Sequence, residues 1–278
     1  MNRTILTATM CAACAFVSVI APLSIALRAA QTTSTPAVRA DPALIADLVA
    51  ANRILADEKI FDAFGHVSAR DSRNPNRYYL ARSLAPALVT AADILEFDLD
   101  SNAAGAKGTA LYLERFIHGE IYKARPDVMA IVHDHSPALI PFGVSSVPLR
   151  PMSQLAGFIG DGVPVFDIRA AAGMTDMLVS NPDRGRALAK SLGARAAVLM
   201  RGHGVTVVGA SLPIAVGRSI YLDRNAALQA QAIALGGTIT YLDPEEARQV
   251  IASGENGGYS RAWELWKSKA MATPKYKP

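Results

Sequence analysis

The feature that most constrains this chain is the apolar run at residues 128–132, which leads directly into His133, Asp134 and His135. The run is short and rich in β-branched residues, so it predicts a buried strand. Because side chains alternate between the faces of a strand, His133 and His135 would share one face and Asp134 would point to the other. Two imidazoles at a strand end can bind one divalent cation. A polar strand end without a metal is the alternative.

A third histidine, His203, follows another apolar run and lies between Gly202 and Gly204, which allow the chain to turn. Three histidines that leave a coordination position open are typical of a catalytic metal site. Glu114 falls on a helix predicted at 109–124, and His118 lies on the same face one turn later. A carboxylate beside such a site is placed for proton transfer, whereas a solvated glutamate is the simpler alternative.

Helix and strand patterns alternate along the rest of the chain. Asp-Pro or Asn-Pro pairs at Asp41, Asn181 and Asp243 predict helix starts. Strands are predicted at 64–70, 77–81, 94–99, 128–135, 163–167, near Val198 and at 206–208, and a long helix from about Ser211 to Gly236. Strands interleaved with helices predict an α/β layered domain.

The first thirty residues differ from the remainder, because residues 4–27 carry no charge. They predict a signal peptide with Ser24-Ile25-Ala26 as the cleavage site, and an uncleaved anchor or a mis-assigned start are the alternatives. We expect a leader at 1–30, a linker at 31–40, one domain at 41–270 and a tail at 271–278. A cleaved leader predicts a periplasmic or exported protein. Without cleavage the protein would contact a membrane through the anchor, and without a leader it would be cytoplasmic.

Cysteine and charge narrow the function classes further. Both cysteines, Cys11 and Cys14, lie in the leader, so a processed chain would have no disulfide and no thiolate ligand. The 28 Lys and Arg residues are scattered among 24 Asp and Glu residues, without the basic face that nucleic-acid binding requires. We therefore expect a small-molecule substrate and no nucleic-acid partner.

Several motifs lie in order along the chain at 113–118, 121–122, 125–128 and 130–135, with a Gly65-His66-Val67-Ser68 turn before them and 201–204 after them. Together they resemble the class II aldolase/adducin family, which includes fuculose-phosphate aldolase and ribulose-phosphate 4-epimerase. The resemblance implies a layered α/β/α domain with a central, largely antiparallel mixed sheet. It also implies a homotetramer with active sites between subunits, to which Tyr241 or Tyr259 of a neighbour would contribute.

The resemblance assigns roles to individual residues. His133, His135 and His203 would hold a divalent metal, with zinc favoured over manganese. Glu114 would be the general acid/base, and His118 would orient it. The ion would act as a Lewis acid that stabilises an enolate. Substrate-binding residues would be Gly65, His66, Ser68, Arg82 and Ser83.

Two departures from the family pattern bear on the substrate. Tyr112 and Leu113 stand where the sugar-phosphate aldolases have two serines, and His66 replaces an asparagine, so a phosphorylated sugar is disfavoured. The Arg82-Ser83 loop resembles a branch that includes the pyridine-dicarboxylate decarboxylase of vitamin B6 breakdown, and Arg82 would bind a carboxylate or form a surface ion pair. We predict a metal-dependent lyase that cleaves a C–C bond by retro-aldol reaction or decarboxylation. A metal-dependent epimerase or dehydratase, and a non-catalytic adducin-like scaffold, are the alternatives.

Overall fold

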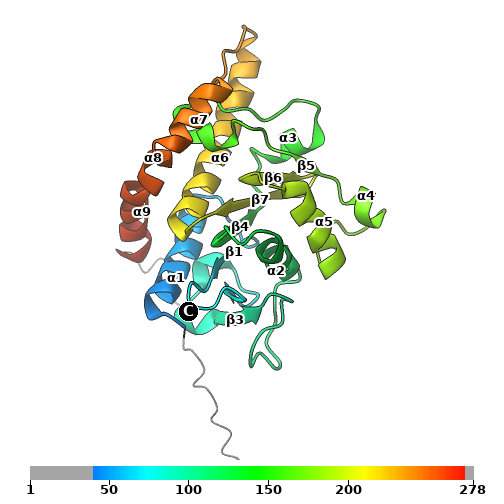
Figure 1. Ribbon diagram of the computed structural model, residues 1–278, viewed down its shortest axis with the longest axis vertical. Helices are drawn as coiled ribbons and strands as arrows, with labels where there is room; N and C mark the ends of the chain where they lie inside the picture. The colour runs from blue at the N-terminus through cyan, green and yellow to red at the C-terminus, as the bar shows by residue number, and fades with distance from the viewer. Residues whose placement is uncertain (1–39, 273–278) are drawn as a thin grey trace, which may run out of the picture. The chain divides into compact units, whose positions relative to one another are not determined.

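The computed structural model describes residues 40–272, and in these residues a single seven-stranded sheet organises the fold (Figure 1). The strand order is β3-β2-β1-β4-β7-β6-β5, and every neighbouring pair is antiparallel except β5 and β6. The strands are β1 (His66–Arg70), β2 (Arg77–Ala81), β3 (Ile94–Asp98), β4 (Ala130–Asp134), β5 (Val165–Phe166), β6 (Ala197–Met200) and β7 (Gly204–Gly209). The expected mixed, largely antiparallel sheet is confirmed.

Helices cover both faces of this sheet. The helices are α1 (Pro42–Asp57), α2 (Arg115–Ala124), α3 (Ile140–Val144), α4 (Arg169–Ala172), α5 (Pro182–Leu192), α6 (Leu212–Leu235), α7 (Pro244–Ala252), α8 (Glu255–Gly258) and α9 (Ser260–Ala272), with 3-10 turns η1 (Pro86–Leu88), η2 (Ala91–Asp93) and η3 (Gln154–Ile159). The expected starts are confirmed, since the side chains of Asp41, Asn181 and Asp243 each accept a hydrogen bond from the first turn.

Two hydrophobic cores form, one on each face. Val67, Val132 and Val207 pack with α1, α6 and α9, whereas Ile131 and Val208 pack with α2 and α5. The two sets of helices lie on opposite sides of the sheet (Figure 1). Because alternate residues of one strand belong to different cores, the architecture is the layered α/β/α domain that we expected.

The helix expected at 109–124 is shorter than predicted and begins only at Arg115. Leu111 and Tyr112 are partly buried against the α2-side core, and the Tyr112 hydroxyl donates a hydrogen bond to the carbonyl oxygen of Leu84. These contacts hold the segment before α2 away from the helix. Glu114 is therefore the residue that precedes the helix, with φ −89° and ψ 16°.

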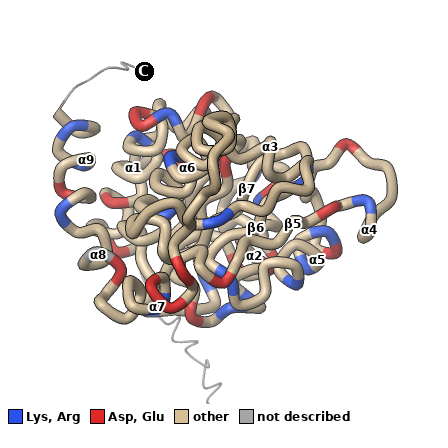
Figure 2. The backbone as a smooth tube through the Cα atoms, turned by 90° about the horizontal axis from the view of Figure 1, so that it is seen from above, with Lys and Arg blue, Asp and Glu red and all other residues tan. Residues whose placement is uncertain are grey.

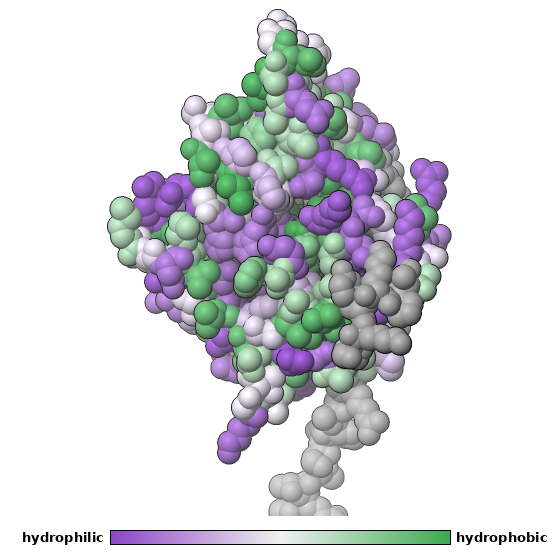
Figure 3. Space-filling view, turned by 180° about the vertical axis from the view of Figure 1, so that it is seen from behind, coloured by the Kyte–Doolittle hydropathy of each residue, from purple (hydrophilic) through white to green (hydrophobic). Residues whose placement is uncertain are grey.

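The charged residues are interspersed along the chain (Figure 2), and polar and hydrophobic side chains mix on the face opposite to that of Figure 1 (Figure 3). Among residues 40–272 no helix has the length and apolarity needed to cross a membrane. The leader at 1–30, both cysteines, most of the linker and residues 273–278 of the tail lie outside the described residues. The expected domain bounds of 41–270 stay a prediction.

Candidate metal centre and active site

The end of β4 delivers two histidines to one side of the sheet. His133 lies on the face of β4 that carries Ile131, toward α2, while Asp134 points to the other face, toward Asp223 of α6. His135 follows directly after β4. The alternation expected from the sequence therefore holds at this strand end.

His203 reaches these histidines through the turn between β6 and β7. Gly202 has φ +64°, a left-handed conformation that favours glycine. At Gly204 an added Cβ would lie 2.0 Å from the carbonyl oxygen of Asp134, so only glycine lets this turn approach the end of β4. As a result His203 Nε2 lies 3.2 Å from His135 Nε2.

Glu114, His133, His135 and His203 form one cluster of metal-ligand atoms. Each offers one atom, and these atoms lie within 4.8 Å of one another. Glu114 Oε2 is 3.4 Å from Nε2 of both His133 and His203. The His135 and His203 rings are stacked, whereas the His133 ring stands nearly perpendicular to both.

The donor atoms of this cluster fit a cation. His133 Nδ1 lies 3.0 Å from the carbonyl oxygen of Val205, which can only accept, so Nδ1 carries the ring proton and Nε2 a lone pair. The buried Nε2 of His133 has no hydrogen-bond partner and faces a carboxylate oxygen of Glu114. Two electron-pair donors that face each other in a buried site need either a proton or a metal cation between them.

The same contacts also determine the electrostatics of Glu114. Burial would raise the pKa of Glu114, but the contacts with His133 and His203 outweigh it and hold the pKa well below its usual range. Its other oxygen, Oε1, accepts a hydrogen bond of 2.8 Å from the backbone N–H of Val179. Burial, followed by His133 and His203, lowers the pKa of His135 to about 4, so this imidazole is neutral at pH 7 and able to bind a metal.

His118 does not orient Glu114 as we expected. Its Nε2 lies 2.6 Å from His66 Nδ1, and its Nδ1 lies 2.6 Å from the hydroxyl of Ser68. The expectation assumed one continuous helix through both residues. Since α2 begins after Glu114, that side chain leaves the helix axis and is held by Val179 instead.

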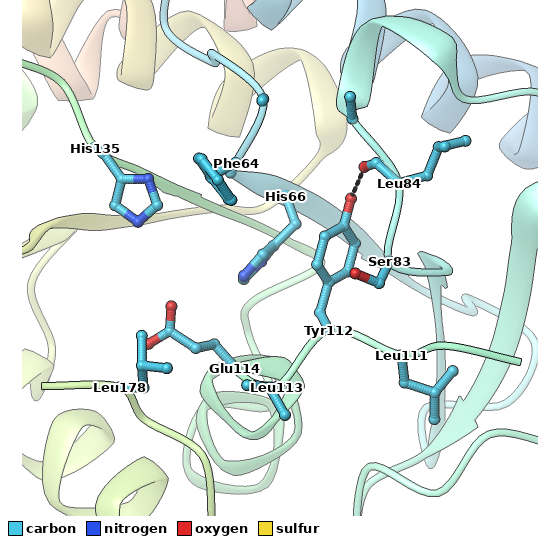
Figure 4. A pocket seen from close by; sticks show the side chains of 13 residues that line it. Phe64, His66, Ser83, Leu84, Leu111, Tyr112, Leu113, Glu114, His135 and Leu178 are labelled. Carbon is cyan, nitrogen blue, oxygen red and sulfur yellow. Dashed lines mark hydrogen bonds between the residues drawn. The ribbon is translucent and has the colours of Figure 1, made fainter. Parts of the chain in front are cut away.

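A cavity of about 500 Å³ opens beside the cluster (Figure 4). Its lining residues are Ala63, Phe64, Gly65, His66, Ser83, Leu84, Ala85, Leu111, Tyr112, Leu113, Glu114, His135 and Leu178. In the described part of the chain, the lining therefore includes neither lysine nor arginine. Most of the wall is apolar, and the polar groups gather where Glu114, His66 and His135 meet.

The predicted substrate residues separate into two groups. Gly65, His66 and Ser83 line the cavity, with Gly65 at φ +95°. Ser68 is fully buried behind His118. Arg82 is not part of the lining, and its Nε donates a hydrogen bond of 2.7 Å to Asp93. Arg82 therefore forms the ion pair that was the alternative expectation for this residue.

Other residues of the site were missed or misplaced by sequence reasoning. Leu178 and Val179 come from the segment before α5, where no motif marks them, because a backbone N–H is supplied by any residue except proline. Tyr112 forms part of the cavity wall and lies against His66, with ring centroids 4.8 Å apart. Tyr259, expected to serve a neighbour, is 2% exposed and stacks on Tyr221 of its own chain.

A layered α/β/α fold with a histidine and glutamate cluster beside an apolar cavity is typical of an enzyme, and the cluster could hold a metal ion. Comparison with known proteins agrees: the model of the class II aldolase and adducin N-terminal domain matches residues 46–230. The chain belongs to the class II aldolase and adducin family.

Three proteins illustrate which members of the family are similar to this chain. Decarboxylase tropJ of Talaromyces stipitatus is 34% identical over 77% of this chain and 88% of its own length. The 3,4-dihydroxyphthalate decarboxylase of Arthrobacter keyseri is 30% identical over 76% and 87%. The structure of L-fuculose 1-phosphate aldolase from Glaciozyma antarctica PI12 has a TM-score of 0.68, 25% identity, and covers 86% of this chain and 94% of that one. These matches support an enzyme of the lyase class.

Proposed function

We propose that this protein is a divalent-metal-dependent decarboxylase of aromatic acids that carry a hydroxyl group next to the carboxylate. The single observation that carries the proposal is the cavity wall, which is mainly apolar and has neither lysine nor arginine among its lining residues in the described chain. Relatives named as decarboxylases, one of them acting on 3,4-dihydroxyphthalate, support the same reaction.

The physical reason lies in the charge change of decarboxylation. A carboxylate loses its charge as it leaves as CO2, so a cation that holds it stabilises the ground state more than the transition state. An apolar wall disfavours the carboxylate relative to the neutral product and also excludes water. A sugar phosphate would instead benefit from a cationic side chain in the cavity, because the phosphate keeps its charge throughout the reaction.

The metal would be held by His133, His135 and His203, with Glu114 beside it. When bound, it supplies Lewis-acid chemistry, which withdraws electron density from the oxygens of the substrate. Zinc is favoured over manganese, because three imidazoles with an open position are a common zinc donor set.

Glu114 can supply the proton that the reaction needs. As a carboxylate it accepts the proton of the substrate hydroxyl, and it returns this proton to the ring carbon as the C–C bond to the carboxylate breaks. The electron pair of that bond stays on the ring carbon until the proton arrives, and CO2 leaves. The product then takes one proton from solvent, so the balance closes with no oxidant or reductant.

Retro-aldol cleavage is the second candidate, and the likeness to L-fuculose 1-phosphate aldolase favours it. The side chains of Tyr112 and Leu113 argue against a phosphate. The Tyr112 hydroxyl is engaged with the backbone of Leu84, and the Leu113 side chain has no polar atom.

The test is CO2 release from 2-hydroxybenzoates and 3,4-dihydroxyphthalate by zinc- and manganese-loaded protein, beside aldehyde release from L-fuculose 1-phosphate. We expect CO2 release, reduced roughly a hundredfold or more by Glu114→Gln. Glu245→Gln, an exposed carboxylate on α7, is the matched control and should retain full activity. Aldehyde release without CO2 from any aromatic acid would favour the aldolase.

Assembly and location complete the proposal. We propose a homotetramer, and the exposed Phe64 and Leu113 beside the cavity support a covering subunit. Light scattering at micromolar concentration tests it, and a monomer would contradict it.

We also propose export through a cleaved leader, which N-terminal sequencing of the native protein tests.

A further inference from the structure

A chain of buried hydrogen bonds runs from α2 through β1 to the cavity. The Tyr122 hydroxyl lies 2.8 Å from Ser68 Oγ, and Ser68 Oγ lies 2.6 Å from His118 Nδ1. His118 Nε2 in turn lies 2.6 Å from His66 Nδ1. These four residues are at most 4% exposed, so water does not compete for these groups.

The hydrogen atoms in this chain can be assigned by counting donors and acceptors. If Tyr122 donates to Ser68, then Ser68 donates to His118 and His118 Nε2–H donates to His66 Nδ1. In the reverse order, the Tyr122 hydroxyl would have to donate elsewhere, and in the described chain Ser68 is its one hydrogen-bond partner. A buried hydroxyl without an acceptor disfavours the reverse order by roughly tenfold to a hundredfold.

The surroundings of Tyr122 reinforce this direction. Its ring lies under the guanidinium of Arg70, 4.6 Å from the ring centroid, and its carbonyl oxygen accepts a hydrogen bond from the same arginine. Burial raises the pKa of Tyr122 well above its usual range, so the hydroxyl keeps its proton. Tyr122 is thus a fixed donor at the inner end of the chain.

At the outer end, the His66 ring points into the cavity between Tyr112 and Glu114 (Figure 4). We propose that Tyr122, Ser68 and His118 hold His66 as the Nε2–H tautomer, so that His66 donates a hydrogen bond to the carboxylate of the substrate and is neither a base nor a metal ligand. The identity of the acceptor rests on the proposed decarboxylase function, whereas the tautomer does not.

A neutral donor suits that role better than a cation would. Its directional hydrogen bond orients the carboxylate. It also stabilises the negative charge of the carboxylate, which is lost as CO2 leaves, less than a cation would. Among the cavity-lining residues other than the candidate metal ligand His135, Ser83 is the second side chain that offers a neutral donor and is not engaged by the backbone. His66 is the one that lies against the metal cluster, with its ring centroid 5.0 Å from that of His133.

The tautomer can be observed directly by 15N NMR of the histidine rings in zinc-loaded and metal-free protein. The chain has five histidines, and His66→Asn assigns the signals of His66 by their loss. We expect an unprotonated Nδ1 and a protonated Nε2 at His66. A protonated Nδ1 would overturn the inference.

A positioning role for the buried chain needs its own test. Ser68→Ala removes the hydroxyl that directs His118, so a second tautomer of His66 should become detectable. Ser83→Ala, which removes a hydroxyl from the cavity wall but not from the chain, is the matched control and should leave the spectrum of His66 unchanged. A spectrum of Ser68→Ala identical to that of the unaltered protein would contradict control by the chain.

Ligand binding tests the donor role. 3-Nitrocatechol carries a nitro group in the shape of a carboxylate that cannot leave, and catechol lacks it. We expect His66→Phe to weaken 3-nitrocatechol binding by about threefold to tenfold more than catechol binding, and His66→Gln to restore part of the difference. Equal losses for both ligands would refute the contact. These readouts do not involve CO2, so failure of decarboxylation alone would leave the tautomer and the donor role standing.

Discussion

The two faces of β1 and β4 differ sharply, although the same strands form both. Toward α1 and α6, Val67, Ala69 and Val132 are fully or almost fully buried in an apolar core. Toward α2, His66 and His133 occupy the alternate positions; His66 belongs to the buried hydrogen-bond chain, and His133 belongs to the cluster that could hold a metal. Neighbouring residues of one strand thus contribute to the apolar core on one face and to the candidate site on the other, because side chains alternate between the faces of a strand.

The largest expected effect tests the chemical face. His133→Ala removes a proposed metal ligand whose Nε2 faces Glu114, so metal content and CO2 release should fall together, the latter by on the order of a thousandfold. Metal analysis and turnover measure this, and circular dichroism should report an intact fold. Full metal occupancy with unchanged turnover would remove His133 from the ligand set.

The neighbouring residue tests the core face. Val132→Ala deletes two methyl groups from a side chain that is 0% exposed, and the cavity left behind should lower the free energy of unfolding by about 2 kcal/mol. Urea denaturation measures this loss. Turnover per folded molecule should remain unchanged, and a turnover defect as large as that of His133→Ala would break the division between the faces.

Acid should destabilise the folded protein through a buried histidine on the α2 face. Burial, followed by His133, lowers the pKa of His118 to about 3, whereas in the unfolded chain it is near 6.5. Below pH 6.5 the unfolded chain takes up a proton that the folded chain does not, so stability falls as the pH drops toward 3. Each such histidine costs about 1.4 kcal/mol per pH unit, which is about 2 kcal/mol at pH 5.

This pH dependence is measured by urea denaturation of chelator-treated protein between pH 7 and pH 5, so that metal release does not contribute. In His118→Asn the slope of stability against pH should be smaller by about one proton. An unchanged slope in that variant would show that other groups dominate acid unfolding.

The smallest effect is expected at Arg82, which lies on neither face of the site. Its ion pair with Asp93 is partly exposed, so Arg82→Ala should change the free energy of unfolding by at most about 1 kcal/mol and leave KM within about twofold. Steady-state kinetics tests this, and a tenfold rise in KM would return Arg82 to the substrate site.

Sequence reasoning succeeded where a local rule acts and failed where packing decides. Strand alternation placed His133 and His135 on one face without knowledge of the sheet. The same reasoning applied to helix spacing failed at Glu114 and His118, because contacts of Tyr112 with Leu84 delay the start of α2. The hydrogen bond from Val179 to Glu114 joins residues 65 positions apart, and no pattern in either segment signals it.

By itself, the sequence determined the helix starts at Asp41, Asn181 and Asp243, the alternating faces of the strands and the donor types brought to the site, because these follow from dihedral preferences and side-chain chemistry within a few residues. Only the tertiary structure decided that His203 meets His135, that Arg82 turns to Asp93, and that Ser68 and Tyr122 lie behind His66. These contacts depend on the register of strands distant in sequence and on which polar groups remain unpaired once the cores have closed.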